Sequence, residues 1–208
     1  MINILNLKKV YGSAVILDVP ALTLEPNIYY IKGENGSGKS TFLKILAGLL
    51  PFEGTISFNN EIDLIKNPLA YRKLVNYGAA EPMYPHFLMG NDLIKFFEKT
   101  KKAPTFQANR LIERFNFQEF LNNPIGTYSS GTLKKLSLIL AFIGSPKLLL
   151  LDEPLTTIDA ETVSALYTLI NEYYTKDMVL ILSSHHRFTD KLIINGTLEV
   201  GNHTISLK

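Results

Sequence analysis

Residues 33–41 limit the possible folds of this chain more than any other segment, because they match the phosphate-binding pattern G-x-x-x-x-G-K-[ST]. Glycines in such a loop let successive backbone N–H groups turn toward a phosphate. Lys39 supplies a positive charge for the outer phosphates, and the Ser40 hydroxyl is placed to bind Mg²⁺. The residues expected to form the phosphate site are Gly33, Glu34, Asn35, Gly36, Ser37, Gly38, Lys39, Ser40 and Thr41.

The segments on either side of this loop have the character that a phosphate site needs. Residues 28–31 form an apolar run typical of a buried strand, and residues 41–48 have the pattern of a helix. The N-terminus of that helix would face the anion. The order of strand, loop and helix therefore predicts an α/β fold built around a phosphate.

Composition narrows the class of protein further. The chain has 208 residues, which suit one α/β domain or a domain with an inserted lobe. Its longest apolar stretch, residues 136–143, is far below the roughly 20 residues of a membrane-spanning helix. There is no cysteine and no signal-peptide layout, so a cytosolic location is expected. A net charge of +2 argues against nucleic acid as a partner.

The early part of the chain reads as an antiparallel sheet of short strands separated by turn residues. The segments expected to form it are residues 2–10, 15–17, 21–24 and 54–58. A further strand is expected at residues 71–77, followed by a loop and an inserted helical lobe over about 91–120. The basic run at residues 99–102 is interpreted as a solvated helix end. Residues 195–196 and 201–202 are both expected to form hairpin turns.

A second polar cluster follows the apolar run at residues 148–151, which is typical of a central strand buried on both faces. The run ends in Asp152, Glu153 and Pro154. Two carboxylates at the end of a buried strand are costly unless a cation meets them. We therefore expect Asp152 to hold Mg²⁺ and Glu153 to polarise a water molecule.

Three other features each have a structural and a functional interpretation. Tyr11 either packs at a strand end or stacks on an adenine ring. Residues 128–132 precede a helix over about 133–144, where Ser129 is either a plain N-cap or, with Ser130 and Gly131, part of a second anion site. His185 follows the strand expected at residues 178–182 and is favoured as a ligand of the γ-phosphate; a histidine there is otherwise a surface residue.

Taken in order, these segments resemble the ATP-binding subunit of an ABC transporter over essentially the whole chain. The resemblance rests on an adenine platform, Walker A, the family signature, Walker B with its glutamate, a D-loop and a switch histidine. They fall at Tyr11, residues 33–41, residues 128–132, residues 148–153, Asp159 and His185.

The resemblance implies one P-loop domain of ABC type over residues 1–208. It has a mainly parallel central sheet flanked by helices, an N-terminal antiparallel β subdomain and an inserted helical lobe. The core lobe would comprise residues 1–79 and 146–208, and the helical lobe about 80–145.

The family works as a head-to-tail dimer, here a homodimer or a heterodimer with another ABC ATPase subunit. ATP lies between Walker A of one subunit and the signature of the other, and Mg²⁺ is held by Ser40 and Asp152. The resemblance implies that Glu153 and His185 are the catalytic residues. A membrane-spanning permease would dock on the helical lobe, at the cytoplasmic face of the membrane. The sequence around Tyr84 and Tyr128 looks most like that of small exporter-type subunits.

The sequence departs from the family pattern in several places. Ala80 stands where a glutamine normally binds Mg²⁺, so either water or the neighbouring Glu81 would take its place, with water favoured. Ser130 replaces the first signature glycine and Thr132 the final glutamine, and residues 156–159 depart from Ser-Ala-Leu-Asp. The expected function is ATP hydrolysis that powers transport. The alternative is a nucleotide-gated module with little turnover, and a P-loop kinase is disfavoured because the signature would then have no role.

Overall fold

The computed structural model describes residues 1–184 and 192–208, and the strands in these residues form two sheets. The first, sheet A, is antiparallel with the order β2-β1-β4-β5. Its strands are β1 (Ile2–Tyr11), β2 (Ala14–Leu24), β4 (Glu53–Phe58) and β5 (Ile62–Asp63). The expected antiparallel subdomain is confirmed.

The second sheet, sheet B, has the order β10-β9-β3-β8-β7-β6. It is parallel from β9 to β6, and β10 pairs antiparallel with β9 at one edge. Its strands are β3 (Ile28–Lys32), β6 (Val75–Gly78), β7 (Leu148–Leu151), β8 (Val179–Ser183), β9 (Gly196–Gly201) and β10 (Thr204–Leu207). Helices lie in the connections from β3 to β6, from β6 to β7 and from β7 to β8, as crossovers between parallel strands usually require.

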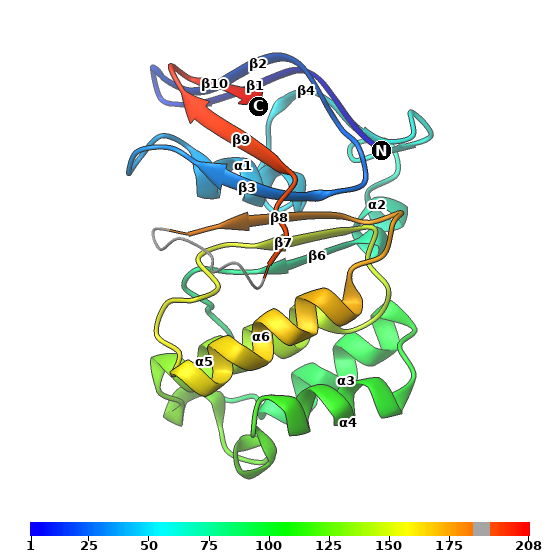
Figure 1. Ribbon diagram of the computed structural model, residues 1–208, viewed down its shortest axis with the longest axis vertical. Helices are drawn as coiled ribbons and strands as arrows, with labels where there is room; N and C mark the ends of the chain where they lie inside the picture. Colours follow the sequence, from blue (N-terminus) through cyan, green and yellow to red (C-terminus); the bar gives the residue numbers. More distant parts are fainter. Residues whose placement is uncertain (185–191) are drawn as a thin grey trace.

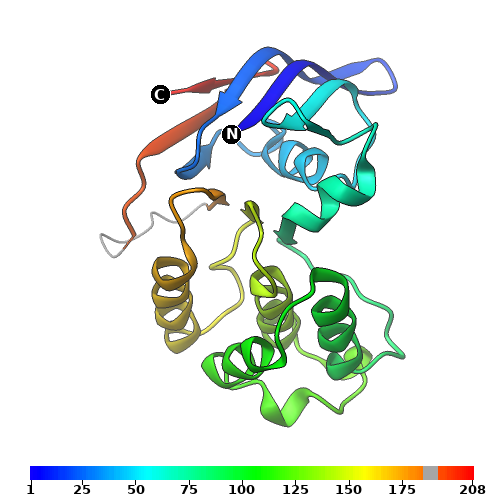
Figure 2. The ribbon, with the colours of Figure 1, turned by 90° about the vertical axis from the view of Figure 1, so that its right-hand side faces the viewer.

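The helices lie on opposite sides of sheet B (Figure 1). Helix α1 (Lys39–Leu46) lies between the two sheets, and Figure 2 shows α3 to α6 on the far side of sheet B. The remaining helices are α2 (Pro68–Leu74), α3 (Gly90–Lys101), α4 (Thr105–Arg114), α5 (Ser130–Phe142) and α6 (Ala160–Tyr173), with short 3-10 turns η1 (Gln118–Phe120) and η2 (Ile125–Thr127).

Sheet B separates two hydrophobic cores. Leu148 and Leu150 of β7 face the core shared with sheet A and α1, whereas Leu149 and Leu151 face the core shared with α3 to α6. Successive side chains of a strand point to opposite faces. Strand β7 is therefore apolar at every position because both of its faces are buried, as the sequence predicted.

The expected helical insertion is present, and its packing is continuous with the sheet. Buried side chains of α3, α4 and α5 belong to the same core as Leu149 and Leu151. Ile94, Ile112 and Phe142 are members of that core from the three helices. The lobe boundaries at residues 80 and 145 stay a prediction.

The expected strand over residues 71–77 is wrong in its first half. Tyr71 lies in α2, which starts at Pro68, a residue whose fixed φ suits the first turn of a helix. Its ring is fully buried against Phe58, with centroids 4.9 Å apart. The extended conformation begins only at Val75.

Two expectations about turns also need correction. Residues 15–17 and 21–24 belong to one strand, β2, because Pro20 is exposed on an edge strand, where a missing N–H costs nothing. Gly196 begins β9 opposite Tyr29, and a Cβ on it would lie 2.6 Å from that ring, so the glycine serves close packing. The hairpin at residues 201–202 is confirmed.

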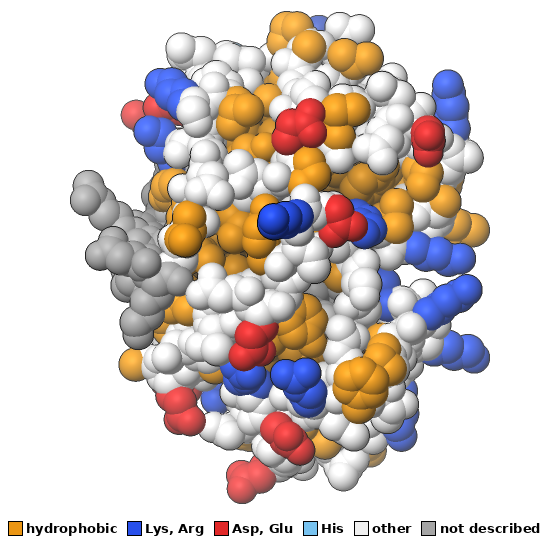
Figure 3. All heavy atoms as spheres, turned by 45° about the vertical axis from the view of Figure 1, so that its right-hand side comes forward, with side chains coloured by type: hydrophobic (Ala, Val, Ile, Leu, Met, Phe, Trp, Pro, Cys, Tyr) orange, Lys and Arg blue, Asp and Glu red, His pale blue; other side chains and the backbone are white. Residues whose placement is uncertain are grey.

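The surface mixes apolar and charged side chains on the face drawn in Figure 3. In the described residues no helix has both the length and the apolar character needed to cross a bilayer.

Candidate functional site

The phosphate-binding loop connects β3 to α1, and its geometry follows from its glycines. Gly38 is the N-cap of α1 with φ 107°, a left-handed conformation that other residues rarely adopt. A Cβ there would also lie 3.1 Å from Leu17 Cδ2. Within the described residues no side chain caps this helix, so its first N–H groups remain available to an anion.

Lys39 is the first residue of α1 and its side chain folds over the loop. Its ammonium group donates hydrogen bonds to the carbonyl oxygens of Gly33 at 2.8 Å and Glu34 at 2.9 Å. The residue is 9 % exposed. The structure therefore holds this positive charge at the mouth of the loop, where the sequence placed it.

Asp152 joins three elements through its buried carboxylate. Its Oδ1 accepts hydrogen bonds from the hydroxyls of Ser40 (3.2 Å) and Ser183 (2.7 Å), and its Oδ2 accepts one from Tyr77 (3.1 Å). The residue is only 1 % exposed, so these donors offset the cost of burying its charge. They bind α1, β8 and β6 to the end of β7.

Tyr77 and Ser183 have no role expected from the sequence. Burial, and then the charge of Asp152 and the hydrogen bond to it, raise the pKa of Tyr77 well above its usual value, so the phenol remains a donor. Both residues lie at the carboxyl ends of parallel strands next to β7, where functional groups gather in such sheets. That position was the signal that could have found them.

Glu153 has a left-handed backbone, with φ 45°. Its N–H donates to Ser183 Oγ at 2.8 Å, and its carbonyl oxygen accepts from Thr156 Oγ1 at 2.8 Å. Such a conformation costs on the order of 1–3 kcal/mol and persists where the surroundings enforce it. The surrounding hydrogen bonds therefore fix the direction in which Glu153 leaves the strand.

Two cavities lie along the phosphate-binding loop. The smaller, about 340 Å³, brings predicted site residues from three regions together: it is lined by Tyr11, Ile16, Asn35, Gly36, Gly38, Lys39, Ser40, Thr41 and Glu153. The larger, about 770 Å³, touches the other predicted loop residues, Gly33, Glu34 and Ser37, and the turn between β9 and β10. The smaller cavity combines a cation, a hydroxyl, a carboxylate and an aromatic ring, which is the chemistry expected of a nucleotide site.

Tyr11 ends β1 and is 49 % exposed. The ammonium group of Lys9 lies 4.6 Å from the centre of its ring, and that group also donates to the carbonyl of Pro51. The ring therefore has a cation near it and belongs to the cavity that Lys39 and Ser40 line.

The predicted signature residues lie at the start of α5. Ser129 is the N-cap, and its Oγ accepts a hydrogen bond from the N–H of Thr132 at 3.1 Å. Gly131 faces the D-loop segment so closely that a Cβ would lie 2.8 Å from the Thr157 carbonyl oxygen. In the described part of the chain, neither cavity along the phosphate-binding loop is lined by Ser129, Ser130 or Gly131.

Asp159 caps the next helix, α6, and its Oδ1 accepts from the N–H of Thr162 at 2.7 Å. That hydrogen bond is the largest cause of its lowered pKa. Lys135 of α5 forms an ion pair with Asp159 at 3.5 Å. The signature segment and the D-loop are therefore held together within one chain.

Lys134, on α5, is a further residue with no role expected from the sequence. It is 1 % exposed, and its ammonium group donates to main-chain oxygens of Ala79, Ala80 and Asp152. Burial lowers its pKa to about 8, while the nearby carboxylates of Asp152, Glu153 and Glu81 act in the opposite direction. No local pattern distinguishes it from Lys135 beside it.

The basic run at residues 99–102 is only partly the solvated helix end that was expected. Lys101 donates hydrogen bonds to the carbonyl oxygens of Arg72 and Val75, both at 2.6 Å. Burial lowers its pKa to about 8. That lysine therefore holds α3 against the start of β6.

His185 lies outside the described residues, so its expected role stays a prediction. Among the residues described, no cluster of three or more His, Asp or Glu side chains could hold a metal by itself. The oxygen atoms of Ser40 and Asp152 are the adjacent pair at the loop.

Comparison with known proteins gives the family. The family model described as ABC transporter matches residues 19–156. The lantibiotic transport ATP-binding protein SrtF of Streptococcus pyogenes is 30% identical over 187 residues, covering 89% of this chain and 80% of SrtF.

Two solved structures share the fold. The structure of an ATP-binding subunit of an ABC transporter superposes with a TM-score of 0.88 at 24% identity, covering 100% of this chain and 89% of that one. A dimeric post-hydrolysis state of the ATP-binding cassette MJ0796, bound to ADP and Pi, gives 0.82 at 18% identity, covering 100% and 98%. The chain belongs to the ABC transporter family, as an ATP-binding subunit and ATPase.

Proposed function

We propose that this ATPase powers a separate membrane-spanning permease, and that it does so as a homodimer or with another ABC ATPase subunit. The observation that carries the proposal is the smaller cavity, where Tyr11, Lys39, Ser40 and Glu153 meet beside Asp152. Those groups can bind the base and phosphates of ATP and activate water.

In this proposal ATP lies along the loop with its adenine against Tyr11. The first N–H groups of α1 bind a phosphate, and the Lys39 ammonium exchanges the Gly33 and Glu34 carbonyls for phosphate oxygens. A phosphate oxygen is the stronger acceptor because it is charged.

The donor atoms of Ser40 and Asp152 fit Mg²⁺. The two oxygens lie 3.2 Å apart, and Mg²⁺ prefers a few protein oxygens together with waters and phosphates. When bound, the ion neutralises charge that develops on the phosphates. Asp152 is kept in place for this purpose by Ser183 and Tyr77.

Glu153 is proposed to accept the proton of the attacking water. Its left-handed backbone and its place in the cavity wall support that role. His185, proposed as a γ-phosphate ligand, and Glu153 are the catalytic pair of the proposal.

The second half of each ATP site is proposed to come from the other subunit. Ser129, Ser130 and Gly131 would bind the γ-phosphate with the N-terminus of α5, and Asp159 would lie at the subunit interface. The exposed positions of Ser129 and Ser130 support this role, and Gly131 beside them is partly buried. A phosphate bound there would accept from N–H groups at the start of α5, in the way that the first site uses those at the start of α1.

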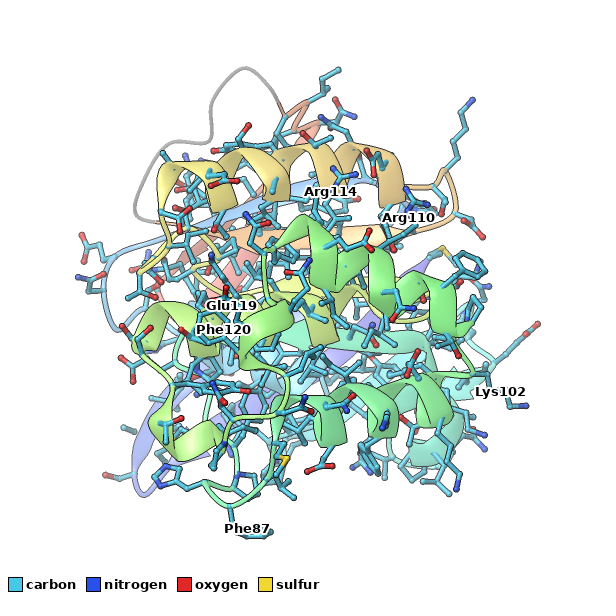
Figure 4. All side chains as sticks on the ribbon, turned by 90° about the horizontal axis from the view of Figure 1, so that it is seen from below. Phe87, Lys102, Arg110, Arg114, Glu119 and Phe120 are labelled. Atoms are coloured by element: carbon cyan, nitrogen blue, oxygen red, sulfur yellow. The ribbon has the colours of Figure 1, made fainter. Side chains whose placement is uncertain are left out.

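The permease is proposed to dock on the loop between β6 and α3, which places the chain at the cytoplasmic face of the membrane. Met83 and Phe87 in this loop are 91 % and 82 % exposed, and Figure 4 shows Phe87 pointing away from the body of the protein. Large apolar side chains so exposed are typical of an interaction site when they gather on one segment. Export is the proposed direction, supported by the lantibiotic transport named for SrtF.

The test compares ATPase activity of the full chain alone and with a candidate permease in lipid vesicles. We expect the permease to raise the rate, and Phe87→Ser to reduce that stimulation. Phe106→Ser is the control, since Phe106 is 65 % exposed on α4 but lies outside the loop. Equal stimulation of both variants would remove the proposed docking site, and no stimulation of the parent chain by any permease would remove the coupling.

A further inference from the structure

The two ends of β6 are each held by a lysine from the helical lobe, and of these Lys134 is buried and Lys101 is partly buried. At the start of the strand, Lys101 of α3 donates to the carbonyl oxygens of Arg72 and Val75. Beyond its end, Lys134 of α5 donates to those of Ala79 and Ala80, both at 2.9 Å. The two contacts use the same chemistry at opposite ends of one strand.

Only the second contact reaches the catalytic residues. Lys134 Nζ also lies 3.3 Å from the carbonyl oxygen of Asp152, so its three N–H donors have three main-chain acceptors. The peptide bond that contains this carbonyl joins Asp152 to Glu153. One ammonium group therefore connects α5, the segment after β6 and the backbone of both carboxylate residues.

We propose that Lys134 is a positioning residue for ATP hydrolysis, which makes Asp152 and Glu153 move together with α5 and with residues 79–80. Movement of the loop after β6 reaches the carboxylates through main-chain carbonyls, so the methyl side chain of Ala80 is no obstacle. A buried ammonium group suits this task because losing any one of its three acceptors would cost free energy. The three carbonyl groups are therefore held in fixed positions relative to one another.

Lys134 should affect the rate of turnover and not the affinity for ATP. Lys134 is not among the residues that line the nucleotide cavity, whereas it touches the backbone at Glu153. We therefore expect Lys134→Met to lower kcat about 10- to 100-fold, the usual effect of losing a group that orients a metal ligand such as the one proposed at Asp152. The Kd for ATP should stay that of the parent chain.

Lys101→Met is the matched control. It removes the same kind of ammonium–carbonyl contact from the same strand, at the end away from Asp152. We expect a comparable loss of thermal stability in both variants, with kcat lowered only in Lys134→Met. Lys134→Arg should recover most of kcat because a guanidinium group also donates to several carbonyls, and Lys134→Gln, with two donors, should be intermediate.

The measurements are thermal unfolding, calorimetric ATP affinity and steady-state ATPase kinetics on the full chain. A folded Lys134→Met with the parent kcat would overturn the inference, as would an equal loss of kcat in Lys101→Met. A matching loss of ATP affinity would show instead that Lys134 serves nucleotide binding. If the methionine variant does not fold, the arginine and glutamine variants decide in the same way: kcat equal to that of the parent in Lys134→Gln, despite a lost donor, would contradict the proposal.

Discussion

Helices α1 and α5 both begin at a turn rich in serine and glycine, yet their N-termini differ in how the first N–H groups are used. At α1, Gly38 offers no side chain, and no described residue caps the helix. At α5, Ser129 accepts from the N–H of Thr132, and its hydroxyl also pairs with that of Thr132. The first end leaves its first N–H groups to an anion within one chain, whereas at the second end the serine already occupies the N–H of Thr132.

A serine and glycine pattern before a helix therefore does not by itself identify an anion site that is complete within one chain. The residues around the two helix N-termini differ in the same way. Lys39 and Asp152 flank the first end, whereas the second lies against the Thr157 carbonyl and beside the Lys135–Asp159 ion pair. In the proposed dimer the α5 end gains a phosphate only from the other subunit.

The largest effect is expected for Glu153→Gln, which should trap a dimer in which the α1 end of one subunit and the α5 end of the other bind the same ATP. Glu153→Gln should lower kcat about 10²- to 10⁴-fold, because a positioned base contributes that much, while ATP binding persists. ATP should then hold the two subunits together, and size-exclusion chromatography with ATP should show a dimer. A variant that turns over at the parent rate would mean that Glu153 is not the base.

Lys39→Ala removes the positive charge at the N-terminal end of α1. Hydrogen bonds to charged groups contribute about 1.5–3 kcal/mol each, so ATP affinity should fall about 100-fold or more. Lys44→Ala, an exposed lysine on the same helix, is the control and should bind ATP like the parent chain. Calorimetric titration measures both, and an unchanged affinity in Lys39→Ala would contradict the assigned site.

Tyr11→Ala tests whether the α1 end also holds the base. Stacking on an aromatic ring contributes about 1 to 3 kcal/mol, so ATP and GTP should weaken alike. Tyr11→Phe keeps the ring and should retain affinity for both nucleotides. Equal affinities in all three proteins would leave Tyr11 with a packing role only.

Ser129→Ala tests the α5 end, where the smallest effect is expected. Loss of the N-cap should lower the free energy of unfolding by about 0.5–2 kcal/mol, measured by urea denaturation. ATP binding to the separate chain should not change, but the ATP-dependent dimer of Glu153→Gln should weaken when the two changes are combined. Ser130→Ala, which removes no cap, is the control for stability.

The local parts of the fold and the site were predictable from sequence. The phosphate-binding loop is a contiguous pattern between a strand and a helix, and β7 with Asp152 and Glu153 is another. The contacts that complete them depend on strand order: Tyr77 reaches Asp152 only because β6 lies beside β7. The order of the residues along the chain does not show which strands are neighbours in the sheet, so this contact could not be predicted.

The errors have similar physical reasons. Residues 71–74 have strand-like composition, but Pro68 starts a helix there and the Phe58 ring covers Tyr71. Lys101 and Lys134 were missed because a lysine in a helix usually reaches solvent, and only the neighbouring backbone shows what these two bind. Gly196 was interpreted as a turn because its reason, the approach of Tyr29, is remote in sequence.

The order of strands in sheet B has a consequence for synthesis on the ribosome. Strand β3 is complete by residue 32, but its two neighbours, β8 and β9, fall within residues 179–201. Sheet A apart from β5 is contained in residues 2–58 and can pair early. The nascent chain therefore carries β3 with both edges unpaired for most of its elongation, and such long-range pairing folds slowly and exposes an aggregation-prone edge.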